Sequence, residues 1–239
     1  IRDSLSIVSK IKKPPLAIKI LFKILSFSFS PKKRIEKNKD EGERLSDSLE
    51  SMGTTFIKLG QFLATRPDII GEELSVKLEN LQDRLPPFSL LQAKEIIKND
   101  LGTESYNSII NLSESVAAAS IAQVHKAQIN DDGVLKDVAI KILRPRIKKI
   151  FNEEIDAMML FAFLVESFIK KTKRLKLVEV VFLLKEITNL EMDLRFEAAA
   201  ANEYAENTKN DVGFRVPQIY WNYTSENVMT LDWVDGVSI

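Results

Sequence analysis

The sequence of 239 residues contains no cysteine, which excludes disulfide bonds, thiolate metal sites and cysteine nucleophiles. Histidine occurs once, at position 125, so a metal centre built from several histidines is excluded as well. The formal net charge is zero, and this argues against a dedicated nucleic-acid binder. The rest of the composition, with 45% hydrophobic and 28% charged residues, is ordinary for a soluble globular protein.

Charge is nevertheless uneven, because residues 1–38 hold ten Lys and Arg residues against only two acidic ones. Within this segment, residues 14–29 are strongly apolar but are interrupted by Lys19 and Lys23, so they are too short and too charged to span a bilayer. No small-residue cleavage site follows, which argues against a signal peptide. Two interpretations stay open: a helix lying in a membrane interface, and a helix packed on the main domain with solvated lysines.

Residues 41–110 have a helical pattern, with apolar residues recurring at spacings of three and four. The stretch TRPDIIG at 65–71 predicts a turn, in which Asp68 caps the segment that follows. A later helix is expected to begin after Ser89, a favourable N-cap, and to close at Gly102.

From about residue 113 the pattern changes to short β-type runs. VAAAS, AQVHKAQI and DVAIKIL are followed by expected helices over 147–170 and 178–207, and then by runs over 216–223 and 227–234. This order predicts an α+β fold: an antiparallel five-stranded sheet plus helices, as in the small lobe of a protein kinase, with a helical N-terminal extension and no large lobe. The expected domains are a basic apolar segment (1–38), the helical extension (39–112) and the small lobe (113–239).

The third β-type run contains VAIK, the strand motif that presents a phosphate-binding lysine in protein kinases. Alternate side chains of a strand face opposite ways, so Ala139 and Lys141 share one face. In protein kinases, adenine lies beside this alanine and phosphate beside this lysine. An edge strand with a solvent-exposed lysine is an alternative explanation of the VAIK sequence. A kinase lysine also needs a carboxylate, and NLEMDLRFEAAAANEY offers Glu191, Asp193 and Glu197, although a solvated helix would carry the same charges.

A third polar pattern is KLGQ, in which Lys58 and Gln61 lie three apart on one helical face and Gly60 permits a close backbone approach. Glycine within a helix costs about 1 kcal/mol relative to alanine, so a packing or functional reason is expected.

Together, KLGQFLATRPDIIGEEL, VAAASIAQVHKA, VAIKILRP and EMDLRFEAAAANE strongly resemble the UbiB/aarF/ADCK family of atypical protein-kinase-like proteins, over about residues 40–239. The KxGQ signature of that family matches residues 58–61, its alanine-rich loop matches 117–120 and its ExD signature matches 191–193. The resemblance implies that the helical extension folds over the lobe and brings the KxGQ segment to the nucleotide site, which argues against ordinary protein-kinase activity.

The resemblance also implies the residues of the site. The expected nucleotide-binding residues are Ala117, Ala118, Ala119, Ser120, Ala139 and Lys141. The expected catalytic residues are Lys141, Glu197, Lys58, Gln61, Glu191 and Asp193, with no metal ligand among them. We favour Glu197 as the partner of Lys141. We expect Glu191 or Asp193 to face Lys58.

The implied cofactor is ATP or ADP with Mg²⁺, whose ligands are expected in a large lobe after the hinge-like LDWVDGVSI. No catalytic-loop or DFG-type aspartate follows, so we expect these 239 residues alone to be catalytically inactive and to bind nucleotide weakly. Both ends look cut, which predicts a piece of a longer protein.

The resemblance ties the chain to ubiquinone and related prenyl-quinone biosynthesis at a membrane, as an atypical kinase-like ATPase or phosphotransferase. The implied partners are a nucleotide, the membrane surface or a prenyl-quinone lipid, and proteins of quinone biosynthesis, but no nucleic acid. The expected location is the bacterial cytoplasmic membrane, with the mitochondrial inner membrane as the alternative. The rival interpretation is a non-catalytic scaffold, or a truncated or split gene product, that binds lipid or protein partners.

Two further expectations concern the first two β-type runs. His125 has no nucleophile or carboxylate partner near it in sequence, so a structural role is favoured over a general base. No glycine occurs between Gly102 and Gly133, and alanine disfavours positive φ, so the loop at 117–120 is expected to form a tight turn or a helix-like backbone.

Overall fold

The structure is a computed structural model, and it describes residues 41–79, 81, 85–131 and 133–236. The described chain divides into two compact units. Unit 1 holds residues 41–79, 81 and 151–185, and unit 2 holds 85–131, 133–150 and 186–236.

Unit 1 begins with a group of short helices: α3 (Glu41–Met52), α4 (Thr54–Ala64), α5 (Pro67–Ile70) and α6 (Glu72–Glu79). Leu49, Ala64, Leu78 and Leu81 form their buried apolar core. The expected turn at 65–71 is in part a short helix, and the cap assigned to Asp68 is wrong. Asp68 lies inside α5, where its carboxylate accepts hydrogen bonds of 2.8 and 2.7 Å from the Arg66 guanidinium.

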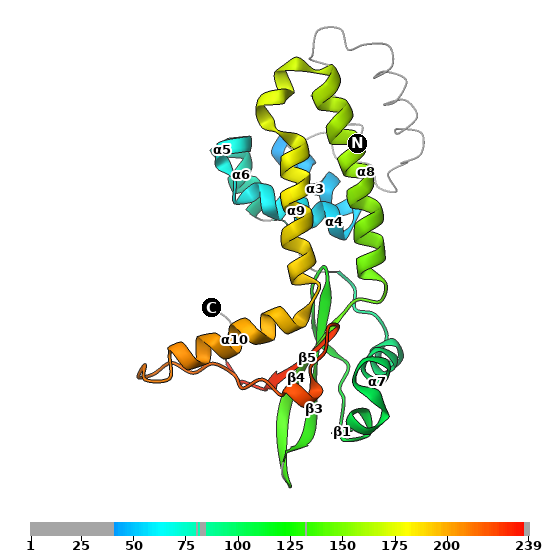
Figure 1. Cartoon of the computed structure of the whole chain (residues 1–239), viewed down its shortest axis with the longest axis vertical. Coiled ribbons are helices and arrows are strands. Elements are labelled where there is room, and N and C mark those ends of the chain that lie inside the picture. Colours follow the sequence, from blue (N-terminus) through cyan, green and yellow to red (C-terminus); the bar gives the residue numbers. More distant parts are fainter. Residues whose placement is uncertain (1–40, 80, 82–84, 132, 237–239) are drawn as a thin grey trace. The chain divides into compact units, whose positions relative to one another are not determined.

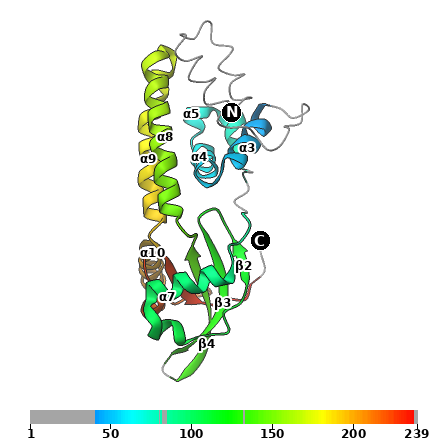
Figure 2. The same cartoon turned by 90° about the vertical axis from the view of Figure 1, so that its right-hand side faces the viewer.

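The second part of unit 1 comes from two longer helices, α8 (Ile147–Phe168) and α9 (Leu177–Glu191), which lie side by side (Figure 1, Figure 2). The basic break between them folds as a 3₁₀ helix, η1 (Lys170–Leu175). The carboxylate of Glu166 in α8 accepts a hydrogen bond of 3.2 Å from the backbone N–H of Val178 in α9. Of the described helices, none is both long enough and apolar enough to cross a membrane.

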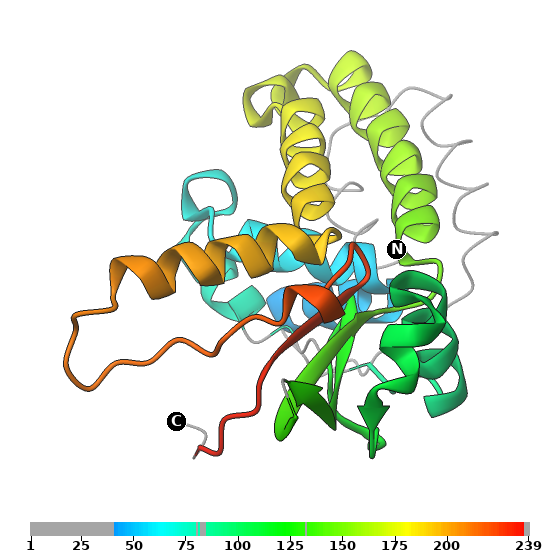
Figure 3. The same ribbon diagram turned by 60° about the horizontal axis from the view of Figure 1, so that its bottom comes forward.

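Unit 2 contains a five-stranded antiparallel sheet with the strand order β1-β3-β4-β5, and β2 also pairs with β3. The strands are β1 (Ile109–Ile110), β2 (Ser115–Ala118), β3 (Ala122–Asp131), β4 (Val134–Leu143) and β5 (Val228–Asp232). Helix α7 (Leu90–Asn107) and helix α10 (Leu194–Asn207) lie on opposite sides of this sheet (Figure 3). The expected α+β fold with the small-lobe sheet is confirmed.

One predicted strand is wrong. Residues 216–223 do not form a strand, because only Ile219 makes a bridge, to Leu231, and Trp221–Tyr223 turns into the 3₁₀ helix η2. Pro217 has no N–H to donate to a strand ladder, which disfavours regular pairing here. The fifth strand is instead β1, which the sequence pattern did not indicate.

Helix α7 belongs with the sheet rather than with the short helices of unit 1. Its buried Ala93 and Ile97 pack in one core with the inner side chains of the sheet, so α7 is part of compact unit 2. Ser89 caps α7 as predicted, in a reciprocal capping box with Gln92. Gly102 has a φ of 81° and a ψ of 168°, which is not helical, so the first helical stretch of α7 closes there as predicted and a second stretch continues to Asn107.

Candidate functional site

The two faces of the central strands have different environments. Val138, Ile140 and Ile142 of β4 are 0% exposed and form the core under α7. Ala139 and Lys141 alternate with them and are half-buried on the other face, which lies on the side of α10 (Figure 3). The predicted adenine-side alanine and phosphate-side lysine therefore share a face that the core does not fill.

Lys141 is held by Glu197 of α10. Its Nζ donates to both carboxylate oxygens of Glu197, at 2.6 and 2.7 Å, and this is the pair that the sequence favoured. The two side chains are 26% and 48% exposed. An ion pair at this exposure contributes little to folding, because water screens it. Its consequence is geometric, since it fixes the direction of a long lysine side chain.

The position of Glu197 depends on a break between two helices. The predicted continuous helix over 178–207 is wrong: α9 ends at Glu191, and α10 begins after Asp193, which is its N-cap. The Asp193 carboxylate accepts a hydrogen bond from the backbone N–H of Arg195 at 3.1 Å. Asp193 therefore does not share a helical face with Glu197, which lies in the first turn of α10.

Asp193 and Arg195 also form an ion pair, with N–O distances of 2.9 and 2.7 Å. This hydrogen bonding from Arg195 lowers the pKa of Asp193 below its usual value. Glu191, the last residue of α9, is half-buried.

The alanine-rich segment forms a tight turn, as its lack of glycine indicated. Strand β2 ends at Ala118, and the N–H of Ala119 donates to the carbonyl of Ala122 at 2.8 Å. Ser120 lies inside the turn and is 0% exposed. On β2, Ala117 lies opposite Val124 of β3. The turn therefore joins the edge strand to the strand that lies beside Lys141.

Ala139 and Lys141 have apolar neighbours on the adjacent strands that the sequence motifs did not indicate. In the register of the sheet, Val124 lies opposite Lys141, and Leu231 lies opposite Ala139. Directly opposed residues of antiparallel strands share a face. Val124, Ala139 and Leu231, all half-buried, thus form a small apolar area beside the lysine, and together with Lys141 they define the Lys141 face. The alternation of side chains along the predicted strands was the signal that could have placed Val124 and Leu231 on this face.

His125 lies on the buried face and has a structural role. Its Nε2 lies 2.8 Å from the Gln123 amide nitrogen, and its Nδ1 lies 2.8 Å from the carbonyl of Ser113. The N–H of Phe88 donates to the amide oxygen of Gln123, which fixes the orientation of that amide. His125 must therefore accept at Nε2 and donate from Nδ1 as a neutral ring. Burial lowers its pKa below the usual value.

The KxGQ residues belong to unit 1. Lys58 and Gln61 are half-buried on α4, and Gly60 between them is fully buried. A Cβ atom at Gly60 would collide with the Leu81 side chain and would lie 2.9 Å from Cδ1 of Leu49. The glycine therefore has a packing reason within its own unit. The expected approach of Lys58 and Gln61 to the Lys141 face stays a prediction.

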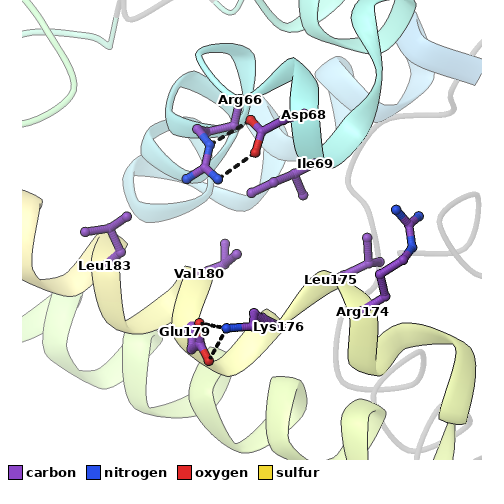
Figure 4. Close-up of a pocket in the computed structure, with 9 residues that line it drawn as sticks. All are labelled: Arg66, Asp68, Ile69, Arg174, Leu175, Lys176, Glu179, Val180 and Leu183. Atoms are coloured by element: carbon purple, nitrogen blue, oxygen red, sulfur yellow. Dashed lines mark hydrogen bonds and ion pairs between the residues drawn. The ribbon is translucent and has the colours of Figure 1, made fainter.

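A pocket of about 300 Å³ lies within unit 1, and none of the expected site residues lines it (Figure 4). Its charged side chains are partly satisfied by one another, because Arg66 pairs with Asp68, and Lys176 pairs with Glu179. Within the described residues there is no group of three or more His, Asp or Glu side chains that is able to hold a metal ion.

Comparison with known proteins supplies a family and several relatives. The model of a family described as "ABC1 atypical kinase-like domain" matches residues 80–239. "Probable protein kinase UbiB" of Marinobacter nauticus is 34% identical over 226 residues, which cover 94% of this chain and 40% of the relative. The proteins of the same name from Cellvibrio japonicus and Azotobacter vinelandii are also 34% identical over 226 residues. The chain spans about two-fifths of the length of these relatives.

Proposed function

Because the chain belongs to the ABC1 atypical kinase-like family, the one that its UbiB/aarF/ADCK motifs indicated, we propose that it binds an adenine nucleotide on the Lys141 face. One observation carries the proposal. The VAIK lysine is held by a carboxylate of helix α10, on a face of the sheet that the core leaves open. Both are requirements of a kinase-like phosphate site.

Each residue of the Lys141 face has a separate task in this proposal. Lys141 donates to a phosphate oxygen, and Glu197 keeps its ammonium group directed at that place. Val124, Ala139 and Leu231 provide an apolar surface for the base. Mg²⁺ bound with the nucleotide would neutralise phosphate charge. Lys141, the polar side chain of the Lys141 face, is a cation and is therefore suited to phosphate rather than to the metal.

The wider role is part of the same proposal. We propose that the protein to which this chain belongs acts as an ATPase or phosphotransferase in ubiquinone or prenyl-quinone biosynthesis, at the bacterial cytoplasmic membrane. Relatives that are named UbiB support the assignment, and the basic apolar segment 1–38 suits a membrane surface.

A binding experiment tests the nucleotide site. We expect Lys141→Met to weaken the affinity for MgATP or MgADP by about tenfold or more, because a charge-assisted hydrogen bond to phosphate is lost. Isothermal titration calorimetry measures this directly. Lys136→Met is the matched control, since Lys136 is also on β4 and ion-paired, to Asp131 at 2.6 Å, but lies on the opposite face from Lys141.

Two results would count against the nucleotide site. If Lys141→Met binds MgATP or MgADP with unchanged affinity, Lys141 is not part of the nucleotide site. Absence of nucleotide binding by the unmodified protein would favour the rival interpretation, a non-catalytic scaffold.

A further inference from the structure

Arg144 follows β4 directly and reaches back to the alanine-rich turn. Its Nε and Nη2 donate to the carbonyl of Ala119, at 3.0 and 2.8 Å. The same guanidinium donates from Nη1 to the carbonyl of Pro86 at 2.9 Å, and from Nη2 to that of Leu85 at 3.3 Å. One half-buried side chain thus bonds backbone carbonyls from two segments that are far apart in sequence.

The backbone of Arg144 adds a further contact with the turn. Its N–H donates to the carbonyl of Ile121 at 2.8 Å, so the turn is held from both the main chain and the side chain of one residue. A guanidinium offers five donors in a planar fork and is able to serve several carbonyls at once. A lysine ammonium is a single point charge and does not reproduce this geometry.

The turn needs such support, because β2 is a weak strand. It has four residues, pairs only with β3 and has an irregular register between Ser115 and Ala117. Val116 on this strand is 52% exposed, so little apolar packing holds the strand in place. Irregular edge pairing leaves ladder hydrogen bonds unmade, and the contacts of Arg144 then determine how closed the turn stays.

We propose that Arg144 is a positioning residue for the nucleotide: it keeps the alanine-rich turn closed beside the Lys141 face and fastens it to residues 85–86. The consequence for ligand binding rests on the nucleotide site proposed above. Leu85 and Pro86 are the first described residues of unit 2 after the chain leaves unit 1.

The first test measures the turn without any nucleotide. In the purified protein, Arg144→Lys is expected to speed amide hydrogen exchange at Ala119 by about tenfold, because its hydrogen bond to Ala122 opens more often. The amide of Ile140 in central β4 serves as the internal reference. Arg146→Lys makes the same chemical change two residues later, at an exposed side chain, and is expected to leave exchange at Ala119 unchanged. Equal protection of Ala119 in the Arg144→Lys variant and the unmodified protein would overturn the proposal.

The second test links the turn to the ligand. We expect Arg144→Lys to weaken the affinity for MgADP by about fivefold, and Arg146→Lys to change it by less than about twofold. In a protein that already carries Ala119→Gly, Arg144→Lys should weaken the affinity for MgADP by less than about twofold, because the turn is already loosened by the glycine.

If the double variant loses affinity by the product of the losses in Ala119→Gly and Arg144→Lys, then Arg144 does not act through the turn. This result would overturn the proposal. If the unmodified protein binds no nucleotide, the proposed nucleotide site fails, and so does the role of Arg144 towards the ligand. The exchange measurement then still decides whether Arg144 closes the turn. The two failures are therefore distinguishable.

Discussion

At the scale of single residues, neighbouring strands place two ionisable side chains in opposite environments. Lys141 on the half-open face keeps a charged partner and contact with water, with 26% of its side chain exposed. His125 on the buried face is 0% exposed and neutral, with both ring nitrogens hydrogen-bonded inside unit 2. Strand alternation alone separates a side chain suited to binding phosphate from one suited to the core.

The buried histidine predicts a pH dependence of stability. Burial holds the pKa of His125 below 6.5, although the Ser113 carbonyl and Glu114 partly oppose this shift. The unfolded chain therefore binds a proton more readily than the folded one, so the stabilisation is complete above pH 6.5 and is lost as the pH falls.

We expect urea unfolding to show a lower free energy of unfolding at about pH 5.5 than at about pH 7.5. His125→Asn keeps a donor for Ser113 but does not titrate, and should flatten this part of the profile. An equally steep profile in His125→Asn would assign the dependence to other groups.

At the scale of elements, the break between α9 and α10 sets the geometry of the site. Met192 and Leu194 are 2% and 0% exposed, and Asp193 between them starts the new helix that carries Glu197. Within the ExD signature, the aspartate is thus the helix cap. The exact start of α10 determines where the carboxylate that holds Lys141 lies.

Loss of this cap should lower stability. Asp193→Ala is expected to lower the free energy of unfolding by about 1 kcal/mol, because the N–H of Arg195 loses its acceptor. Asp193→Asn is the matched control, because asparagine caps equally well but removes the charge. Chemical denaturation measures the difference. Equal loss of stability in both variants would show that the ion pair with Arg195, rather than the cap, is what matters.

At the scale of the whole molecule, the proposed membrane contact belongs to the basic N-terminal segment, which lies outside the described residues. Lys19→Glu with Lys23→Glu is expected to reduce binding to vesicles that contain anionic lipid by about thirtyfold or more, since each basic residue near such a surface contributes about 1 kcal/mol. Lys94→Glu with Lys98→Glu on α7 has the same spacing and is the matched control. Vesicle cosedimentation gives the comparison, and equal loss in both double variants would point to general charge rather than this segment.

Local signals explain which parts of the fold could be predicted. The N-cap signal at Ser89 and the alternation in VAIK each lie within a few residues, and both predicted the structure correctly. Strand β1 and the irregular path over 216–223 depend on distant pairing partners, so their own sequence was a poor guide. In the candidate site, the Lys141–Glu197 pair followed from motif order, whereas Arg144 did not, because its partners are backbone carbonyls that no side-chain pattern reveals.

The alternation of core and site residues along β4 also limits which insertions and deletions the protein tolerates. Ten residues of β4 pair with ten of β3, and core and site positions follow one another along the strand. Loss of a single codon inside β4, before Lys141, would rotate every earlier residue to the other face, so that either the lysine or the core side chains would be misplaced. In-frame length changes are therefore expected to be tolerated only at the hairpin tip between Asp131 and Val134.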